Sequence, residues 1–201
     1  ENVNQSSVAW GDYDNDGDPD ILLAGWSDSL YEVTRIYRND GNDVFTDLQA
    51  ALTNVARGPS TKWGDYDNDG DLDILLRGCI AWDDDFGFCG GSITKVYSNE
   101  GNGVFTDINA TLPTISEEPV DWGDYDNDGL LDLLLTNMGS ANQLYRNMGD
   151  GNMEAVPWDA DPGGSHGALW TDYDGDGDVD VFITGQERVQ HRNDGNGTFT
   201  W

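Results

Sequence analysis

An acidic loop followed by an apolar strand recurs four times in this chain and constrains its fold more than any other feature. The segment WGDYDNDGDPDILL covers residues 10–23, and close copies of it begin at Trp63, Trp122 and Trp170. Because like charges repel, a cluster of aspartates at one place indicates a cation that offsets the charge. Repetition with a period of about 50 residues indicates an array of equivalent structural units.

A second sequence block recurs in phase with the acidic loop. Its copies are IYRNDGNDVFTDL (36–48), VYSNEGNGVFTDI (96–108), LYRNMGDGNMEAV (144–156) and QHRNDGNGTFTW (190–201). The asparagine and glycine residues in its centre are typical of a tight turn between two strands. The sequence of each unit therefore predicts four strands: one before the aspartates, one after them and two that flank this turn. No stretch shows the sustained periodicity of a helix.

Four strands in a unit of about 50 residues are the pattern of a propeller blade. We therefore expect an all-β fold, a β-propeller-type array of four four-stranded blades with the acidic loop between the first and second strands of each. We expect the tryptophan of each first strand to pack between adjacent blades. The predicted repeats are 1–54, 55–113, 114–162 and 163–201, within one propeller domain or propeller segment over 1–201.

The spacing of the acidic loop, D-x-D-x-D-G-x-x-D, suits a divalent cation. Side chains at the first, third, fifth and ninth positions can converge if the chain curls tightly, and the glycine at the sixth position permits that turn. The seventh position can add its backbone carbonyl oxygen. Such hard oxygen donors suit Ca²⁺, whereas Mg²⁺ requires a stricter octahedron and zinc would normally recruit His or Cys.

The sequence therefore predicts four calcium-binding loops. The candidate metal ligands, including the seventh position of each loop, are Asp12, Asp14, Asp16, Asp18 and Asp20; Asp65, Asp67, Asp69, Asp71 and Asp73; Asp124, Asp126, Asp128, Leu130 and Asp132; and Asp172, Asp174, Asp176, Asp178 and Asp180.

These repeats resemble the FG-GAP and VCBS-type repeats of integrin-α-like β-propellers and of many secreted microbial proteins. The resemblance covers nearly the whole chain and is carried by the four acidic loops with their following apolar strands. It implies that Asp12, Asp14, Asp16 and Asp20, with their equivalents in the other loops, are calcium ligands. The literal FG and GAP marks are largely absent, which favours the microbial type of repeat.

The formal net charge is −30 at pH 7. This charge argues against nucleic acid and anionic membrane surfaces as partners and favours cations. No apolar run approaches the roughly 18 residues that a membrane span needs. The chain opens on Glu1 instead of Met, which we interpret as a processed or excised start.

Cys79 and Cys89 lie in one short segment, GCIAWDDDFGFCGG. A local disulfide fits them better than a redox pair or half a metal site, because neither of those has its usual spacing here and no His lies nearby. A disulfide indicates an oxidising compartment. Glycosylation sequons at Asn4, Asn109 and Asn196 agree with such a compartment. We therefore expect a secreted glycoprotein, extracellular or at the cell surface.

We expect no enzymatic activity. About half of the 39 acidic residues lie in the four loops, where they are committed to metal. A loop with all of its ligands in place is coordinatively closed, which argues against metal catalysis. His166 and His191 have no partner pattern, and His191 takes the place of a tyrosine in its repeat, so we expect a structural role for it.

Two non-enzymatic functions stay open. Repeats, calcium, sequons and a disulfide fit an adhesive or structural surface scaffold, which we place first, with surface proteins or end-to-end self-association as its contacts. The alternative is a calcium-dependent carbohydrate-binding module, a lectin whose glycan ligand stacks on aromatic loops. The same aromatic side chains could instead cover blade edges against unwanted pairing. They are Trp26, Tyr31, Trp82, Phe86 and Phe88.

Overall fold

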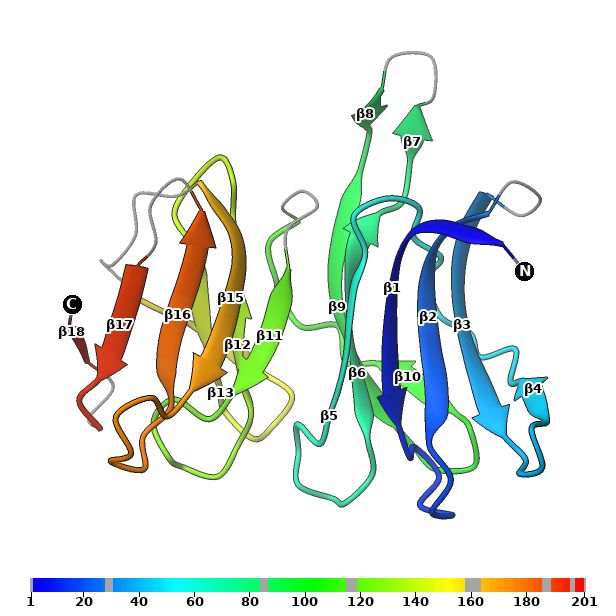
Figure 1. Ribbon diagram of the computed structural model, residues 1–201, viewed down its shortest axis with the longest axis horizontal. Helices are drawn as coiled ribbons and strands as arrows, with labels where there is room; N and C mark the ends of the chain where they lie inside the picture. The colour runs from blue at the N-terminus through cyan, green and yellow to red at the C-terminus, as the bar shows by residue number, and fades with distance from the viewer. Residues whose placement is uncertain are drawn as a thin grey trace. The chain divides into compact units, whose positions relative to one another are not determined.

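The computed structural model is all-β (Figure 1). It describes residues 2–27, 31–83, 87–114, 119–157, 164–185, 189–195 and 198–200. Every regular element within these ranges is a β-strand, which confirms the expected all-β class, whereas the propeller arrangement stays a prediction. Across the same ranges, no helix has the length and apolar character that crossing a membrane requires.

Four antiparallel sheets of four strands each follow one another along the chain. The second sheet has the order β5-β6-β9-β10, because the small β7–β8 sheet is inserted between its second and third strands. The first two sheets comprise β1 (Val3–Gly11), β2 (Asp20–Ser27), β3 (Tyr31–Asn39), β4 (Phe45–Asp47), β5 (Ser60–Gly64), β6 (Asp73–Cys79), β9 (Ser92–Asn99) and β10 (Phe105–Asp107). The other two comprise β11 (Val120–Gly123), β12 (Asp132–Leu135), β13 (Gln143–Asn147), β14 (Met153–Val156), β15 (Ser165–Thr171), β16 (Asp180–Gly185), β17 (Val189–Asn193) and β18 (Phe199–Thr200).

The chain divides into two compact units. The first unit comprises residues 1–65 and 69–117 and holds the first two sheets, and the second comprises residues 66–68 and 118–201 and holds the other two. The four sheets each fall inside one of the predicted repeats, whose boundaries stay a prediction.

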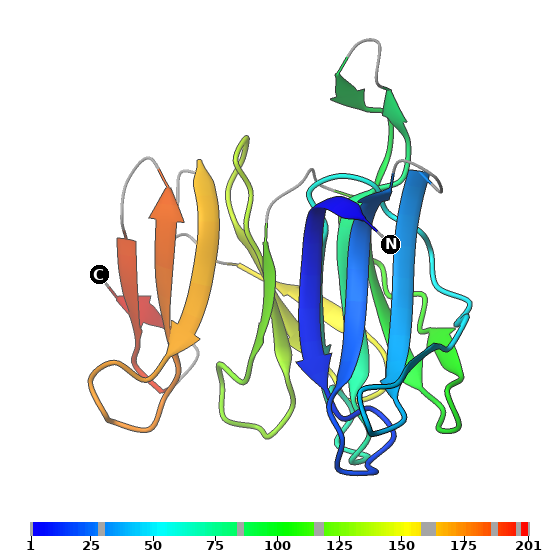
Figure 2. The same cartoon turned by 45° about the vertical axis from the view of Figure 1, so that its right-hand side comes forward.

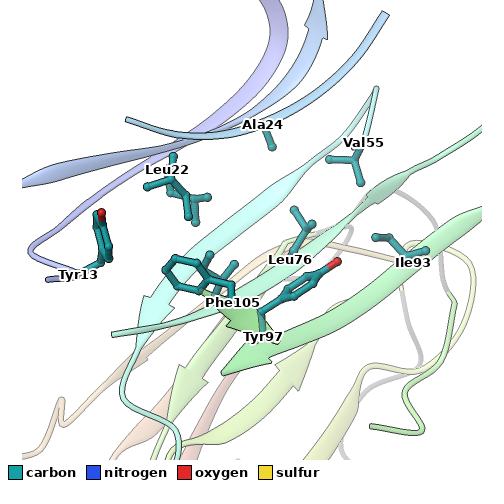
Figure 3. Close-up of a cluster of buried hydrophobic side chains, with 10 residues drawn as sticks. Tyr13, Leu22, Ala24, Val55, Leu76, Ile93, Tyr97 and Phe105 are labelled. Carbon is teal, nitrogen blue, oxygen red and sulfur yellow. The ribbon is translucent and has the colours of Figure 1, made fainter. Parts of the chain in front are cut away.

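The main core of the first unit lies between its two sheets (Figure 3). Leu22 of β2 and Leu76 of β6 are fully buried there, and Tyr97 and Phe105 are buried beside them. Successive side chains of a strand point to opposite faces, so the alternate residues of β2 and β6 supply this core. Burial of these apolar side chains stabilises the pair of sheets.

The second unit has a corresponding core between β12 and β16. Leu134, Val181 and Ile183 are buried there, and Trp170 and Phe199 pack against them. Trp170 belongs to the first strand of the fourth sheet and packs against residues of both its own and the preceding repeat, so the expected packing between adjacent repeats is confirmed for Trp170. It is wrong for Trp10, which is exposed.

The acidic loops join the first strand of each sheet to the second, as the sequence predicts. In the first sheet, Gly11 pairs with Asp20 at the point where the loop begins and ends. The third and fourth strands are joined by the predicted Asn-Gly turns, in which Gly41 and Gly101 have φ angles of 73° and 75°. Glycine suits these turns because a left-handed backbone strains most other residues.

The β7–β8 hairpin, Trp82–Asp83 and Phe88–Cys89, extends from the second sheet. In the first unit it lies at the end of the strands opposite to the acidic loops (Figures 1 and 2). Its base is closed by the predicted disulfide between Cys79 and Cys89, whose Cα atoms are 5.9 Å apart. The disulfide therefore joins the end of β6, in the four-stranded sheet, to the end of the inserted hairpin.

Candidate cation loops and the neighbouring cavity

The first aspartate of each acidic loop closes the loop through backbone hydrogen bonds. In the first loop, Asp12 Oδ1 accepts from the Asp16 N–H at 3.0 Å and Asp12 Oδ2 accepts from the Gly17 N–H at 3.0 Å. The backbone curls as the sequence predicts, with φ angles of 57° at Asn15 and 92° at Gly17. The third loop repeats both bonds, at 3.1 and 3.0 Å.

The ninth aspartate ties the loop to the sheet behind it. Asp20 is fully buried; its Oδ2 accepts from the Tyr13 N–H at 3.0 Å and its Oδ1 from the Asn39 N–H at 2.8 Å. A buried carboxylate that accepts two backbone hydrogen bonds holds its neighbours in one geometry. The ninth residues of the other loops, Asp73, Asp132 and Asp180, are also fully buried.

Three carboxylates gather in each loop, at its first, third and ninth positions. One ligand oxygen from each lies within 4.8 Å of the other two. The groups hold oxygen donors alone, which fits a hard divalent cation. They are Asp12, Asp14 and Asp20; Asp65, Asp67 and Asp73; Asp124, Asp126 and Asp132; and Asp172, Asp174 and Asp180.

The fifth and seventh positions lie outside these groups. Asp16 Oδ1 accepts from the Asp18 N–H at 2.8 Å, and the third loop has the same bond, from the Leu130 N–H to Asp128 Oδ1, at 3.0 Å. The fifth carboxylate therefore shapes the loop, and its role as a ligand stays a prediction, as does that of the seventh carbonyl oxygen.

Burial makes the charge of some of these carboxylates costly. It raises the pKa of Asp132 to about 7, against two backbone hydrogen bonds that lower it. Burial is also the main cause that raises the pKa of Asp20 and Asp126. In the third loop, Arg146 offsets part of the charge, with its Nε 2.7 Å from Asp126 and its Nη2 2.9 Å from Asp128. A cation in each loop would favour the charged forms in the same way.

Asparagines connect each loop to the next repeat within a unit, a feature that the sequence analysis missed. Asn15 Nδ2 donates to Asp71 Oδ1 at 2.8 Å. Asn99, at the end of β9, donates to the Tyr13 carbonyl oxygen at 2.9 Å. The recurrence of asparagine at these two positions was visible in the sequence, but its partners lie more than 50 residues away, so spacing alone could not identify them.

A cavity of about 350 Å³ lies beside the first two loops, within the first unit. Arg38, Asp14, Asp71 and Asn102 supply its polar lining, and its remaining lining residues are Tyr13, Leu48, Gly101 and Gly103. The Arg38 guanidinium also pairs with Asp40, with Nη2 2.7 Å from Oδ1. The sequence analysis did not predict this cavity, because it forms only where two separate repeats meet.

Four of the aromatic candidates lie in strands and not in loops, which corrects the sequence-based expectation, and two of the four, Trp26 and Tyr31, belong to the first sheet. Trp26 is the last residue but one of β2, and Tyr31 begins β3, because the pairing of these strands continues to Ser27 and Tyr31. Their rings pack edge to face with centroids 5.4 Å apart. Tyr31 is exposed, so part of this pair faces solvent.

The other aromatic candidates lie on the inserted hairpin. Trp82 belongs to β7 and Phe88 to β8, and Phe88 is exposed. The Arg57 guanidinium carbon lies 4.0 Å from the centre of the Trp82 ring, a cation–π contact that occupies one face of the indole. Phe86 lies outside the described residues.

The asparagines of two of the three sequons are exposed to solvent. Asn4 is exposed in β1, and Asn109 is exposed after β10, where its Nδ2 donates to the Asp107 carbonyl oxygen at 2.9 Å. Asn196 is not among the described residues. Glycosylation at these positions stays a prediction.

Antiparallel four-stranded sheets, each with three carboxylates gathered in its first hairpin loop, define a class of β-repeat proteins with candidate cation loops. The chain belongs to the family of FG-GAP-like repeats, which match residues 12–76, 82–135 and 124–183. This match confirms the resemblance that the acidic loops indicate. A comparison with curated proteins finds no match to the sequence.

Among solved structures, the chain is similar to a lectin of Agrocybe aegerita described for its specific recognition of non-reducing terminal N-acetylglucosamine. The TM-score is 0.62, the sequence identity is 19%, and the match covers 99% of this chain and 52% of the lectin chain. The chain therefore spans about half the length of that lectin, and the likeness shows a shared fold.

Proposed function

We propose that the chain is a calcium-stabilised, carbohydrate-binding part of an extracellular β-propeller, without a catalytic role. The observation that carries this proposal is the cavity lined by Arg38, Asp14, Asp71 and Asn102 in the first unit. The fold shared with a lectin supports it.

The cavity has the chemistry that a sugar ring needs. Its volume of about 350 Å³ is near the lower end of the range for small-molecule sites. The Arg38 guanidinium and the Asn102 amide can donate hydrogen bonds to a sugar, and the carboxylates of Asp14 and Asp71 can accept them from its hydroxyl groups. The Leu48 side chain offers an apolar surface for the carbon atoms of the ring.

Calcium fits the four loops better than other common metals. Each group of three carboxylates offers oxygen ligands alone, and a backbone carbonyl and water molecules can complete the irregular shell that Ca²⁺ accepts. In the first loop, Asp14 belongs both to the metal group and to the cavity lining, so calcium would also fix one wall of the sugar site.

The propeller arrangement and the extracellular location are supported by separate features. Four tandem four-stranded sheets with short connections are the pattern of propeller blades. The Cys79–Cys89 disulfide fits an oxidising environment outside the cytosol.

A glycan array with Arg38→Ala tests the sugar site. Wild type should bind glycans with a terminal N-acetylhexosamine, and Arg38→Ala should weaken binding at least tenfold, because a charged hydrogen bond contributes about 1.5–3 kcal/mol. Arg192→Ala is the matched control, since Arg192 Nη2 pairs with Asp194 Oδ1 at 2.6 Å as Arg38 pairs with Asp40.

The control variant should bind like wild type. Equal binding by Arg38→Ala and wild type would contradict the cavity as the sugar site. If Trp82→Ala alone abolished binding, the site would move to the inserted hairpin. The absence of any glycan binding in calcium would contradict the lectin proposal as a whole.

An adhesive or structural scaffold is the second candidate function. One observation favours it: Trp10 and Phe45 of the first sheet are 61% and 41% exposed, with ring centroids 6.2 Å apart. Exposed aromatic pairs are typical of surfaces that contact another protein.

A further inference from the structure

A second cavity lies in the first unit, at the end of the strands opposite to the acidic loops, where β1 begins (Figure 1). Its volume is about 370 Å³, within the range of small-molecule sites. Its lining comes from two places in the chain, Gln5 and Ser6 of β1 and the segment Arg57, Gly58 and Pro59 before β5. It shares no lining residue with the cavity beside the first two loops.

A β-bulge brings Gln5 and Ser6 to this cavity. In the pairing of β1 with β2, these two residues together face Gly25 alone. Gln5 has a φ angle of 46°, a left-handed backbone that most side chains disfavour. Directly after the bulge, Ser7 Oγ accepts from the Thr61 N–H at 3.1 Å and fixes β1 beside β5. Such bulges redirect side chains and occur frequently at functional sites.

Arg57, on the other side of the lining, is held at two points. Its carbonyl oxygen accepts from the Cys79 N–H at 3.2 Å, at the end of β6. Its guanidinium carbon lies 4.0 Å from the centre of the Trp82 ring. Trp82 pairs with Cys89 across the inserted hairpin, and the disulfide ties Cys89 to Cys79. The hairpin and its disulfide therefore position the aromatic surface on which the guanidinium lies.

Arg57 also differs from four other arginines, each of which forms an ion pair with an aspartate: Arg35, Arg38, Arg146 and Arg192. The chain has 39 acidic residues and nine basic ones, so carboxylate partners are abundant. Within the described ranges no carboxylate pairs with Arg57, and its buried Nε has no hydrogen-bond partner. A contact with a ring does not satisfy the N–H donors of a guanidinium.

The distance from the acidic loops makes this end of the unit suitable for an anion. Seven residues of strand separate Gln5 from Asp12, which corresponds to about 23 Å at roughly 3.3 Å per residue. The Debye length at physiological ionic strength is about 8 Å, so the charge of the loops is largely screened there. The net charge of −30 still repels polyanions, which favours a ligand with one acidic group.

We propose that this cavity binds a small ligand that carries a single carboxylate. The Arg57 guanidinium pairs with the carboxylate through two parallel N–H groups, a geometry that a planar fork provides and a point charge does not. The Gln5 amide and the Ser6 hydroxyl hydrogen-bond to neighbouring polar groups of the ligand. A uronic acid residue of a glycan has the carboxylate and hydroxyl groups together, and a simple carboxylic acid has the carboxylate alone.

Titration of wild type in calcium with methyl β-glucuronide, methyl β-glucoside and acetate tests the site. The glucuronide should bind with a Kd of about 1–10 mM and at least tenfold more tightly than the glucoside, which lacks the carboxylate. Acetate that binds as tightly as the glucuronide would assign the site to simple carboxylic acids, and weaker binding of acetate would assign it to acidic sugars. Either result supports a carboxylate site.

Nitrogen-15 NMR of wild type locates the bound glucuronide. The resonances of the Gly58 backbone N–H and the Trp82 indole N–H should shift on titration. Arg38→Ala, which changes the cavity beside the acidic loops, should leave these shifts unchanged. A failure of the sugar site at Arg38 is therefore distinguishable from a failure of the carboxylate site.

Matched arginine variants isolate the group responsible. Arg57→Gln should weaken binding of the glucuronide at least tenfold. Arg35→Gln removes the same charge from an ion pair with Asp47 in the same unit and should bind like wild type. If Arg57→Gln does not fold, Arg57→Lys replaces it; this variant keeps the charge but lacks the planar fork, and it should bind at least threefold more weakly than wild type.

Three results would overturn the proposal. The first is equal binding of the glucuronide by wild type and by a folded Arg57 variant. The second is equal binding of the glucuronide and the glucoside by wild type, which would show that the carboxylate is not recognised. The third is the absence of shifts at Gly58 and Trp82 in glucuronide at about 100 mM, ten times the largest expected Kd.

Discussion

Asp18 and Asp20 stand two residues apart in the first loop and carry the same charge, but their surroundings differ. Asp18 is exposed, and it uses its backbone N–H to bond Asp16 Oδ1 at 2.8 Å. Asp20 is buried, and it accepts hydrogen bonds from Tyr13 and Asn39. Position in the loop therefore decides what each carboxylate contributes.

We predict that Asp20→Asn destabilises the chain much more than Asp18→Asn in calcium. Asp20→Asn removes a proposed ligand and replaces one hydrogen-bond acceptor with a donor, at a cost of about 2 kcal/mol. Asp18→Asn should change the free energy of unfolding by no more than about 0.5 kcal/mol, as at other exposed sites. Denaturant titration of the two variants measures the difference.

The pair is matched because each substitution removes one negative charge from the same loop. Asp71 would be a poorer control for Asp73 in the second loop, because its Oδ1 accepts from Asn15. Equal destabilisation by Asp18→Asn and Asp20→Asn would mean that net charge, and not loop geometry, sets the stability.

The raised pKa of Asp132 predicts how stability depends on pH in chelator. The folded-state pKa of about 7 lies above the unfolded value of about 3.9, so folding favours the protonated form. Stability should therefore fall as the pH rises from about 4 to about 7. We expect the melting temperature in chelator to be at least about 3 °C lower at pH 8 than at pH 5.

Asp132→Asn provides the control, because the amide is neutral at both pH values. In chelator this variant should show a smaller drop between pH 5 and pH 8, whereas in calcium it should be less stable than wild type at pH 8. A melting temperature in chelator that rises with pH would contradict this account of the buried carboxylate.

Sequence predicted the backbone of the loops well and their side-chain partners poorly. The left-handed φ angles at Asn15 and Gly17 follow from the local residue types alone. The bond from Asn15 to Asp71 joins two repeats, so it depends on how the sheets pack. Local pattern contains no information about that contact.

At the scale of single elements, the β7–β8 hairpin differs from the strands around it. It has two short strands, is closed by Cys79–Cys89, and lies at the end of the first unit away from the acidic loops. Cys79 is also the last residue of β6 and donates its backbone N–H to the Arg57 carbonyl oxygen at 3.2 Å. The end of β6 therefore has support besides the disulfide.

We predict that reduction of the disulfide loosens the hairpin and leaves the four sheets folded. Closure of a short loop restricts mainly the unfolded chain and contributes roughly 3 kcal/mol on the entropy model. Limited proteolysis after mild reduction should cleave first within residues 80–88. Loss of the far-ultraviolet β-sheet signal under the same conditions would show that the sheets unfold with the hairpin, which would contradict the prediction.

The strands themselves were largely predictable, but their ends were not. Apolar runs after the aspartates became β2, β6, β12 and β16 because buried strands favour such residues. Pairing of β2 with β3 continues past the apolar run to Ser27 and Tyr31, which the sequence analysis placed in a loop. Cross-strand hydrogen bonds decide that extension, and they have no local sequence signal.

At the scale of the whole molecule, the fourfold repeat predicted four sheets and their strand content. It did not predict the division into two compact units or the cavity beside the first two loops. Both depend on contacts between repeats. A repeating sequence pattern predicts only that these contacts are the same at every repeat. The fourth repeat shows that they are not equivalent, since Thr171 stands where the first three repeats have glycine, and Gly11 and Gly123 lie against the tryptophan of the following repeat.

The central claim is that the four acidic loops hold calcium and stabilise the fold. Calorimetric titration of the chelator-treated chain with Ca²⁺ tests it most directly. The account predicts four equivalents bound, one for each group of carboxylates, and one equivalent lost or greatly weakened in Asp20→Asn. Titration without saturable Ca²⁺ binding, or binding that Asp20→Asn leaves unchanged, would contradict it.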